Sequence, residues 1–227
     1  MSQPSEALGW RSVGDLVGRH PDARVALIGA PLNERSLTPG RCDLGPKVLR
    51  GVLPRLSTYD VETGLELEIK VHDAGDVALK AVSPFDAFEP VRDAVAAQAH
   101  RDLTILVGGN NAITRPGVHA LGLERVGVLT LDAHFDLRDP AHVQSSGTPF
   151  AQIAAQCATR GWPFRYACLG VSRASNTRAL FARAAELNVL VHEDHEIRES
   201  TLDAIGAELD AFAAECDALY LTIDIDV

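Results

Sequence analysis

Aromatic side chains are scarce in this sequence, and long hydrophobic runs are missing from it. Phe, Trp and Tyr make up 5% of its 227 residues, so its 46% hydrophobic content comes mostly from Ala, Val and Leu. Such a composition suits helices packed on a sheet. The longest apolar stretches, such as residues 126–131, have the length of a strand, and none is long enough to span a membrane.

Basic residues are also in the minority. The sequence has 21 Lys and Arg against 31 Asp and Glu, a formal net charge of −10, and no basic run. Nucleic acids and anionic membranes bind basic surfaces, so we expect neither as a partner. Residues 1–12 lack the basic-then-apolar order of a signal peptide. The four cysteines show no CxxC spacing, which argues against a zinc knuckle or a disulfide framework and predicts a cytoplasmic protein.

Short apolar runs alternate with helical patterns along the whole chain. Most of the runs are continuously apolar, which is typical of strands covered by helices on both faces. This alternation predicts one domain over residues 1–227, with a three-layer α/β/α architecture and a doubly wound, mostly parallel sheet. The predicted strands are 24–29, 67–73, 103–108, 126–132, 165–171, 189–192 and 219–225, and the predicted helices are 84–100, 177–187 and 200–216. Residues 139–148 form a polar loop.

Three of the predicted strands end in polar residues that apolar packing does not explain. In open α/β sheets, functional sites form at the carboxyl ends of the strands. Side chains alternate along a strand, so we expect the polar residues of one segment to share a face. The three segments are Asp132-Ala-His134-Phe-Asp136, Asp224-Ile-Asp226 and Gly108-Gly-Asn110-Asn111.

Four carboxylates and one imidazole at one sheet edge predict a metal site. Burying unpaired carboxylates costs several kcal/mol each, and two divalent ions would balance four negative charges where one would not. An oxygen-rich set with a single imidazole favours Mn²⁺ over Zn²⁺, with Mg²⁺ as a further option. Either motif alone could be a solvated strand end. Two such motifs, each closing a buried type of strand, favour the metal site.

These segments resemble the motifs of the ureohydrolase family, which includes arginases, agmatinases and formimidoylglutamases. Residues 132–136 resemble its DAHxD motif and residues 224–226 its DxD motif, while residues 73–77 resemble its DxGDV stretch and residues 40–50 its N-terminal loop. The similarity is greatest to the formimidoylglutamase branch, on the evidence of residues 134–138, 145–150, 169–171 and 175–177.

The resemblance implies hydrolysis of a linear amidine, N-formimino-L-glutamate, to glutamate and formamide. It implies two Mn²⁺ ions that activate a water molecule. Asp132 and Asp224 would bridge the ions, Asp136 would complete one shell, and His134 with Asp226 the other. Family members also form homo-oligomers, which we therefore expect here.

Other residues are candidates for catalysis and for substrate binding. The sequence has no GxSxG motif and no convincing Cys–His pair, so we expect no protein nucleophile. Asp136 and His142 are the catalytic candidates, His142 as a proton shuttle. The substrate carries carboxylates, for which arginines are suited, although a surface ion pair is an equally good explanation of each arginine. The substrate-binding candidates are Arg138, Ser146, Arg173 and Asn176.

Two features depart from the family pattern. Asn111 stands where the family has a histidine ligand, which predicts one tight and one weak Mn²⁺ site. The sequence ends one residue after Asp226, which predicts that it lacks the family's C-terminal part. The alternatives are a hydrolase of agmatine or guanidino acids, and a non-catalytic member that binds metal or a metabolite. A dinucleotide-binding enzyme is remote, because no GxGxxG follows the first strand.

Overall fold

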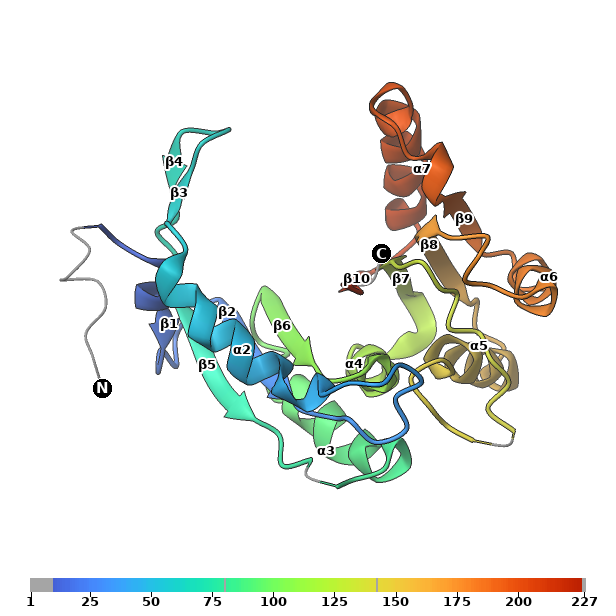
Figure 1. The fold of residues 1–227 in the computed structure, drawn as a ribbon, viewed down its shortest axis with the longest axis horizontal. Helices are drawn as coiled ribbons and strands as arrows, with labels where there is room; N and C mark the ends of the chain where they lie inside the picture. The colour runs from blue at the N-terminus through green and yellow to red at the C-terminus, as the bar shows by residue number, and fades with distance from the viewer. Residues whose placement is uncertain (1–9, 80, 142, 226–227) are drawn as a thin grey trace. The chain divides into compact units, whose positions relative to one another are not determined.

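The chain forms two compact units. The computed structural model describes residues 10–79, 81–141 and 143–225. The first unit is built from residues up to Glu34 and from Pro39 to Asn110, and the second from Arg35 to Thr38 and from Asn111 onward. Each unit has its own four-stranded sheet, coloured blue to green in the first and green to red in the second (Figure 1). The prediction of a single domain that lacks a C-terminal part stays a prediction.

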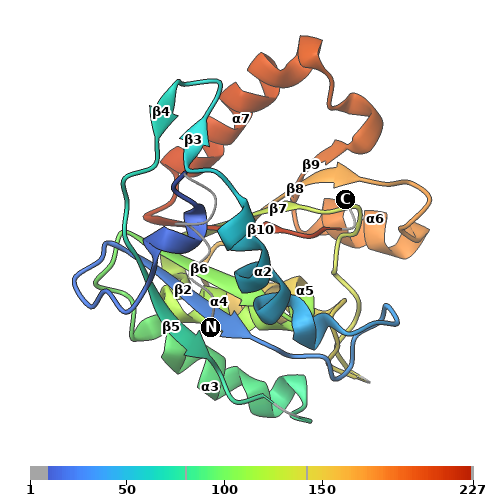
Figure 2. The ribbon, with the colours of Figure 1, turned by 60° about the vertical axis from the view of Figure 1, so that its left-hand side comes forward.

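The sheet of the first unit is parallel, in the order β1-β5-β2-β6. Its core strand β2 is apolar and buried along nearly its whole length. Figure 2 shows α2 and α3 on opposite sides of this sheet, as right-handed crossovers in opposite directions require. The elements are β1 (Val17–Gly18), β2 (Val25–Ala30), α2 (Gly45–Val52), β5 (Val71–Asp76), α3 (Pro84–Ala96) and β6 (Leu103–Gly108), with a hairpin of β3 (Tyr59–Asp60) and β4 (Leu65–Glu66).

The sheet of the second unit is also parallel, in the order β10-β7-β8-β9. Side chains alternate along β8. Tyr166 and Cys168 pack into the core made with α4, α5 and α6, whereas Ala167 and Leu169 pack with Ile205 of α7 on the other face. The elements are α4 (Thr114–Ala120), β7 (Val126–Leu131), α5 (Pro149–Arg160), β8 (Arg165–Val171), α6 (Arg178–Glu186), β9 (Leu190–Glu193), α7 (Leu202–Ala214) and β10 (Ala218–Ile223).

The predicted fold class is confirmed, while several boundaries move. Strand β5 begins at Val71 rather than at residue 67, because Leu67 and Ile69 are exposed. Helix α3 ends at Ala96. Helices α2, α4 and α5 were not predicted: α2 and α4 are short, and α5 directly follows the polar loop 139–148, which has no helix or strand among its described residues. No helix in the described part of the chain is long and apolar enough to cross a membrane.

We expect Phe150→Ala to lower the free energy of unfolding by about 3–5 kcal/mol. The Phe150 side chain is fully buried on α5, and its ring stacks on that of Tyr166 with centroids 4.3 Å apart. Urea unfolding of the two proteins measures the loss. Phe85→Ala on α3 is the matched control, because the Phe85 side chain is 71% exposed. Equal losses in the two variants would contradict the assignment of Phe150 to the core.

Candidate metal centre

Two of the predicted ligands lie side by side at the end of the second sheet. Strands β7 and β10 are paired in register, with Ile223 opposite Leu131. The backbone N–H of Asp224 still donates to the carbonyl oxygen of Leu131 at 2.9 Å. Asp132 and Asp224 therefore follow the last paired residues of two neighbouring strands, and the structure brings them together as the sequence predicts.

The segment from Asp132 to Asp136 is a loop and not an extension of the strand. Strand β7 ends at Leu131, and Asp136 has a backbone φ of +46°, in the left-handed region. Asp and Asn adopt this region more readily than other residues that carry a Cβ. Strand alternation was therefore the wrong reason for expecting Asp132, His134 and Asp136 to share a face, because loop geometry sets their positions. Strand β10 likewise ends at Ile223, so Asp224 also lies outside the strand.

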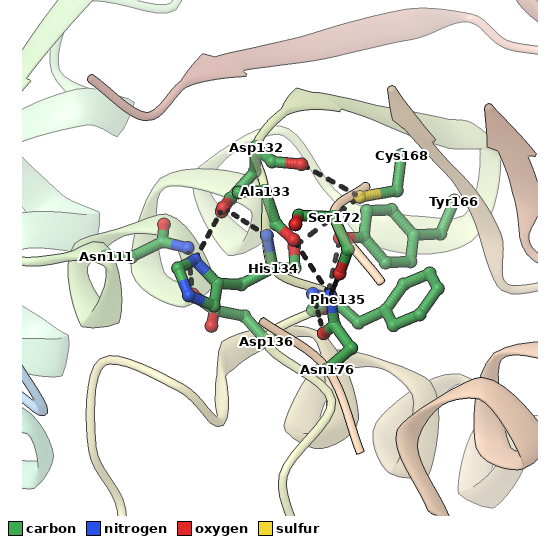
Figure 3. A network of polar contacts seen from close by, with 10 residues as sticks. All are labelled: Asn111, Asp132, Ala133, His134, Phe135, Asp136, Tyr166, Cys168, Ser172 and Asn176. Carbon is green, nitrogen blue, oxygen red and sulfur yellow. Dashed lines mark hydrogen bonds and ion pairs between the residues drawn. The ribbon is translucent and has the colours of Figure 1, made fainter. Parts of the chain in front are cut away.

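Asp132 is the most buried of the candidate ligands that the structure describes, with 1% of its surface exposed. Its Oδ1 accepts a hydrogen bond from the backbone N–H of His134 at 2.7 Å, and it lies 3.2 Å from Nδ1 of the same residue. Figure 3 shows the imidazole held against this carboxylate. Asp132 thus fixes the position of His134 while it remains buried at the edge of the sheet.

Asp136 is in an environment that disfavours its negative charge. Burial raises the pKa of its carboxyl group to about 7, and the neighbouring charge of Asp132 adds to this effect. A hydrogen bond from Nδ2 of Asn111, at 2.6 Å, acts in the opposite direction. A divalent cation beside Asp132 and Asp136 would stabilise both ionised carboxylates. The donor set therefore fits a hard cation.

The described residues hold only part of the predicted ligand set. Among them, no three His, Cys, Asp or Glu side chains converge closely enough to hold an ion. Asp226, a predicted ligand, and His142, the predicted proton shuttle, lie outside the described residues. The metal roles of Asn111, Asp132, His134, Asp136, Asp224 and Asp226 stay predictions.

Asn111 is oriented by Asp136 and by Thr114, a residue that the sequence analysis missed. Oγ1 of Thr114 donates to Oδ1 of Asn111 at 2.5 Å. The Asn111 amide therefore turns its N–H towards Asp136 and its oxygen towards Thr114. A hydroxyl three residues after an asparagine that starts a helical turn is a signal that could have identified Thr114.

The predicted substrate-binding residues have different surroundings. Arg138 is exposed and lines a cavity of about 420 Å³ together with Leu180 and Arg183. Arg173 pairs with Glu193. Oγ of Ser146 accepts a hydrogen bond from the backbone N–H of Leu37 at 3.0 Å. The side-chain amide of Asn176 hydrogen-bonds to backbone groups of Ala133, Phe135 and Ser172. The substrate-binding roles of these four residues stay predictions.

Comparison with known proteins identifies the family. Residues 23–227 match the Arginase family, so the chain belongs to it. This match contains both carboxylate motifs and the sheet of the second unit, in which Asp132 and Asp224 follow β7 and β10. The predicted resemblance to ureohydrolases is confirmed.

Several similar proteins are formimidoylglutamases. The chain is 44% identical over 197 residues to the formimidoylglutamase of Ralstonia nicotianae. The aligned region covers 81% of this chain and 57% of that protein. It spans 31% to 57% of the length of four such relatives.

Solved structures share the fold. The structure of Bacillus subtilis formimidoylglutamase superposes with a TM-score of 0.84 at 24% identity, over 96% of this chain and 71% of that one. Trypanosoma cruzi formiminoglutamase with Mn²⁺ has a TM-score of 0.80 at 24% identity, over 95% and 75%. The latter protein has also been solved with Mn²⁺ as a variant in which an asparagine is replaced by histidine.

Proposed function

We propose that this chain carries the metal-binding part of a Mn²⁺-dependent hydrolase that converts N-formimino-L-glutamate and water into L-glutamate and formamide. The observation that carries the proposal is the placement of Asp132 and Asp224 at the ends of adjacent strands, with His134 held against Asp132. The names of the relatives at 43% to 56% identity support this substrate.

The protein's contribution to the metal centre is a concentration of negative charge. Asp132, Asp224, Asp136, His134 and Asp226 would hold two Mn²⁺ ions, and bound Mn²⁺ supplies a water activated for attack on the amidine carbon. Asp132 is buried, so its charge is poorly screened by solvent.

In our proposal, Asn111 gives the two Mn²⁺ ions unequal affinities. Its N–H donates to Asp136, and its amide oxygen, which already accepts from Thr114, is a neutral and weaker ligand for Mn²⁺ than an imidazole. We therefore propose a weaker site for the ion that shares Asp136. A variant of Trypanosoma cruzi formiminoglutamase with histidine in place of an asparagine is a precedent for the substitution that tests this, Asn111→His. The expected result is tighter binding of the second Mn²⁺ in a calorimetric titration, and unchanged binding would contradict it.

We propose that cationic and hydroxyl side chains bind the substrate. We propose that Arg138, which lines the 420 Å³ cavity, binds a substrate carboxylate, because a guanidinium can bind a carboxylate in a bidentate manner. Ser146 and Arg173 are further candidates, and His142 remains the proposed proton shuttle. We also propose a small molecule as the only class of ligand besides Mn²⁺, and a homo-oligomeric, cytoplasmic protein.

The direct test is glutamate release from N-formimino-L-glutamate by the purified chain. We expect release after incubation with Mn²⁺ and none after incubation with a chelator, followed by recovery when Mn²⁺ is restored. Agmatine, arginine and guanidino acids are the comparison substrates, and preference for any of them would replace the proposed substrate. If none is hydrolysed, the non-catalytic alternative applies to this chain.

A further inference from the structure

Asn176 bonds to the backbone of the segment that carries the candidate ligands. It lies in the loop between β8 and α6, and its Nδ2 donates to the carbonyl oxygens of Ala133, at 2.8 Å, and Ser172, at 2.9 Å. Its Oδ1 accepts from the backbone N–H of Phe135 at 3.1 Å. Figure 3 shows the amide facing this segment. One side chain thus holds the residues on both sides of His134.

These three bonds use every polar group of the amide once. Both hydrogens of the Asn176 Nδ2 are donated, and its oxygen accepts one bond, so little hydrogen-bonding capacity is left for a substrate. The spacing of the contacts is also specific. Ala133 and Phe135 alternate with Asp132, His134 and Asp136, so the amide binds the backbone between successive candidate ligands.

Side chains of β8 also hold the same segment. The phenol of Tyr166 donates to the carbonyl oxygen of Phe135 at 3.1 Å, and the thiol of Cys168 donates to that of His134 at 3.5 Å. Both side chains are buried, and the ring of Phe135 packs edge-on against Phe181 of α6, with centroids 5.0 Å apart. The segment is therefore fixed by side chains although it is not part of a strand.

We propose that Asn176 is a positioning residue for the metal centre, which holds the Ala133–Phe135 backbone in the conformation that presents His134 and Asp136 to the cation. This role replaces the predicted contact of Asn176 with the substrate. This inference rests on the proposed function in one respect, namely that the site binds a cation. Loss of the amide leaves the ligands in place but lets their backbone relax, and loss of such supporting groups lowers metal affinity by about 10- to 100-fold.

The test compares two substitutions at Asn176 with one at its neighbour. Asn176→Ala removes all three bonds, and Asn176→Asp keeps the shape and the acceptor but removes both donors. Thr177→Ala is the matched control, because Oγ1 of Thr177 caps α6 by accepting from the N–H of Leu180 and touches no part of the ligand segment. Its loss destabilises the adjacent helix alone.

Two measurements on the full chain are needed. In calorimetric titrations with Mn²⁺, we expect both Asn176 variants to bind about 10- to 100-fold more weakly than the unmodified protein, and Thr177→Ala to bind as tightly. In hydrogen exchange followed by NMR, we expect the amide of Phe135 to exchange about tenfold faster in Asn176→Ala than in Thr177→Ala.

The two readouts separate this proposal from the proposed function. Unchanged Mn²⁺ affinity in the Asn176 variants, or an equal loss in Thr177→Ala, would overturn the positioning role. If the unmodified protein binds no Mn²⁺, the proposed metal centre is wrong, whatever the role of Asn176. The exchange rate at Phe135 then still decides the role of Asn176: faster exchange in Asn176→Ala supports it, and an unchanged rate overturns it.

Discussion

Replacing Asp132 by asparagine is expected to lower the rate of the proposed hydrolysis of N-formimino-L-glutamate on the order of a thousandfold or more. The substitution retains the size of the side chain and an oxygen that can accept from the backbone N–H of His134. It removes the negative charge of the most buried candidate ligand, which lies at the edge shared by β7 and β10. A neutral amide oxygen binds Mn²⁺ more weakly than a carboxylate does.

Metal content and activity together check this expectation. We expect elemental analysis after dialysis to show less Mn²⁺ per chain in Asp132→Asn, in parallel with the loss of glutamate release. The matched control is Asp210→Asn, the same chemical change at an exposed position of α7. A variant at Asp132 that keeps both its Mn²⁺ and its rate would show that this carboxylate is not part of the centre.

The second large effect is expected on stability, at Gly109. Gly109→Ala should lower the free energy of unfolding of the first unit by more than about 4 kcal/mol. A Cβ at this position would lie 2.5 Å from the carbonyl oxygen of Ala30 and 2.6 Å from the backbone nitrogen of Leu32. Both are backbone atoms, one in the last residue of β2 and the other two residues beyond it. Strand β2 is paired with β6 on one side and β5 on the other, so these atoms cannot move aside easily.

A second glycine separates this close approach from backbone strain. Gly122 has a φ of +73°, compared with +40° for Gly109, and a Cβ there would meet no atom within 4 Å. Gly122→Ala should therefore cost only the strain of the left-handed conformation, about 1–2 kcal/mol. Urea unfolding of both variants gives the two values. Similar losses would mean that the contact with β2 is not what requires glycine at position 109.

The sequence predicted the architecture and the place of the candidate site because both follow from local patterns. Continuous apolar runs identify strands buried on both faces, and β6, β7, β8 and β10 lie within a residue or two of where these runs predict them. Polar residues that end such runs have to gather at one edge of a parallel sheet. Asp132 and Asp224 could be placed together for this reason.

Tertiary structure alone decided how the site's side chains are held. The left-handed backbone of Asp136, the bonds of Asn111 to Thr114 and Asp136, and the bonds of Asn176 to Ala133 and Phe135 appear in no periodic pattern. Several of these bonds join residues 25 to 43 positions apart in the sequence. Such contacts form only after the strands have paired, and an amide has the same composition whether it binds a substrate, a metal or the backbone. The sequence by itself therefore determined the family, the parallel sheets and the acidic edge, whereas the packed structure determined which residues support that edge.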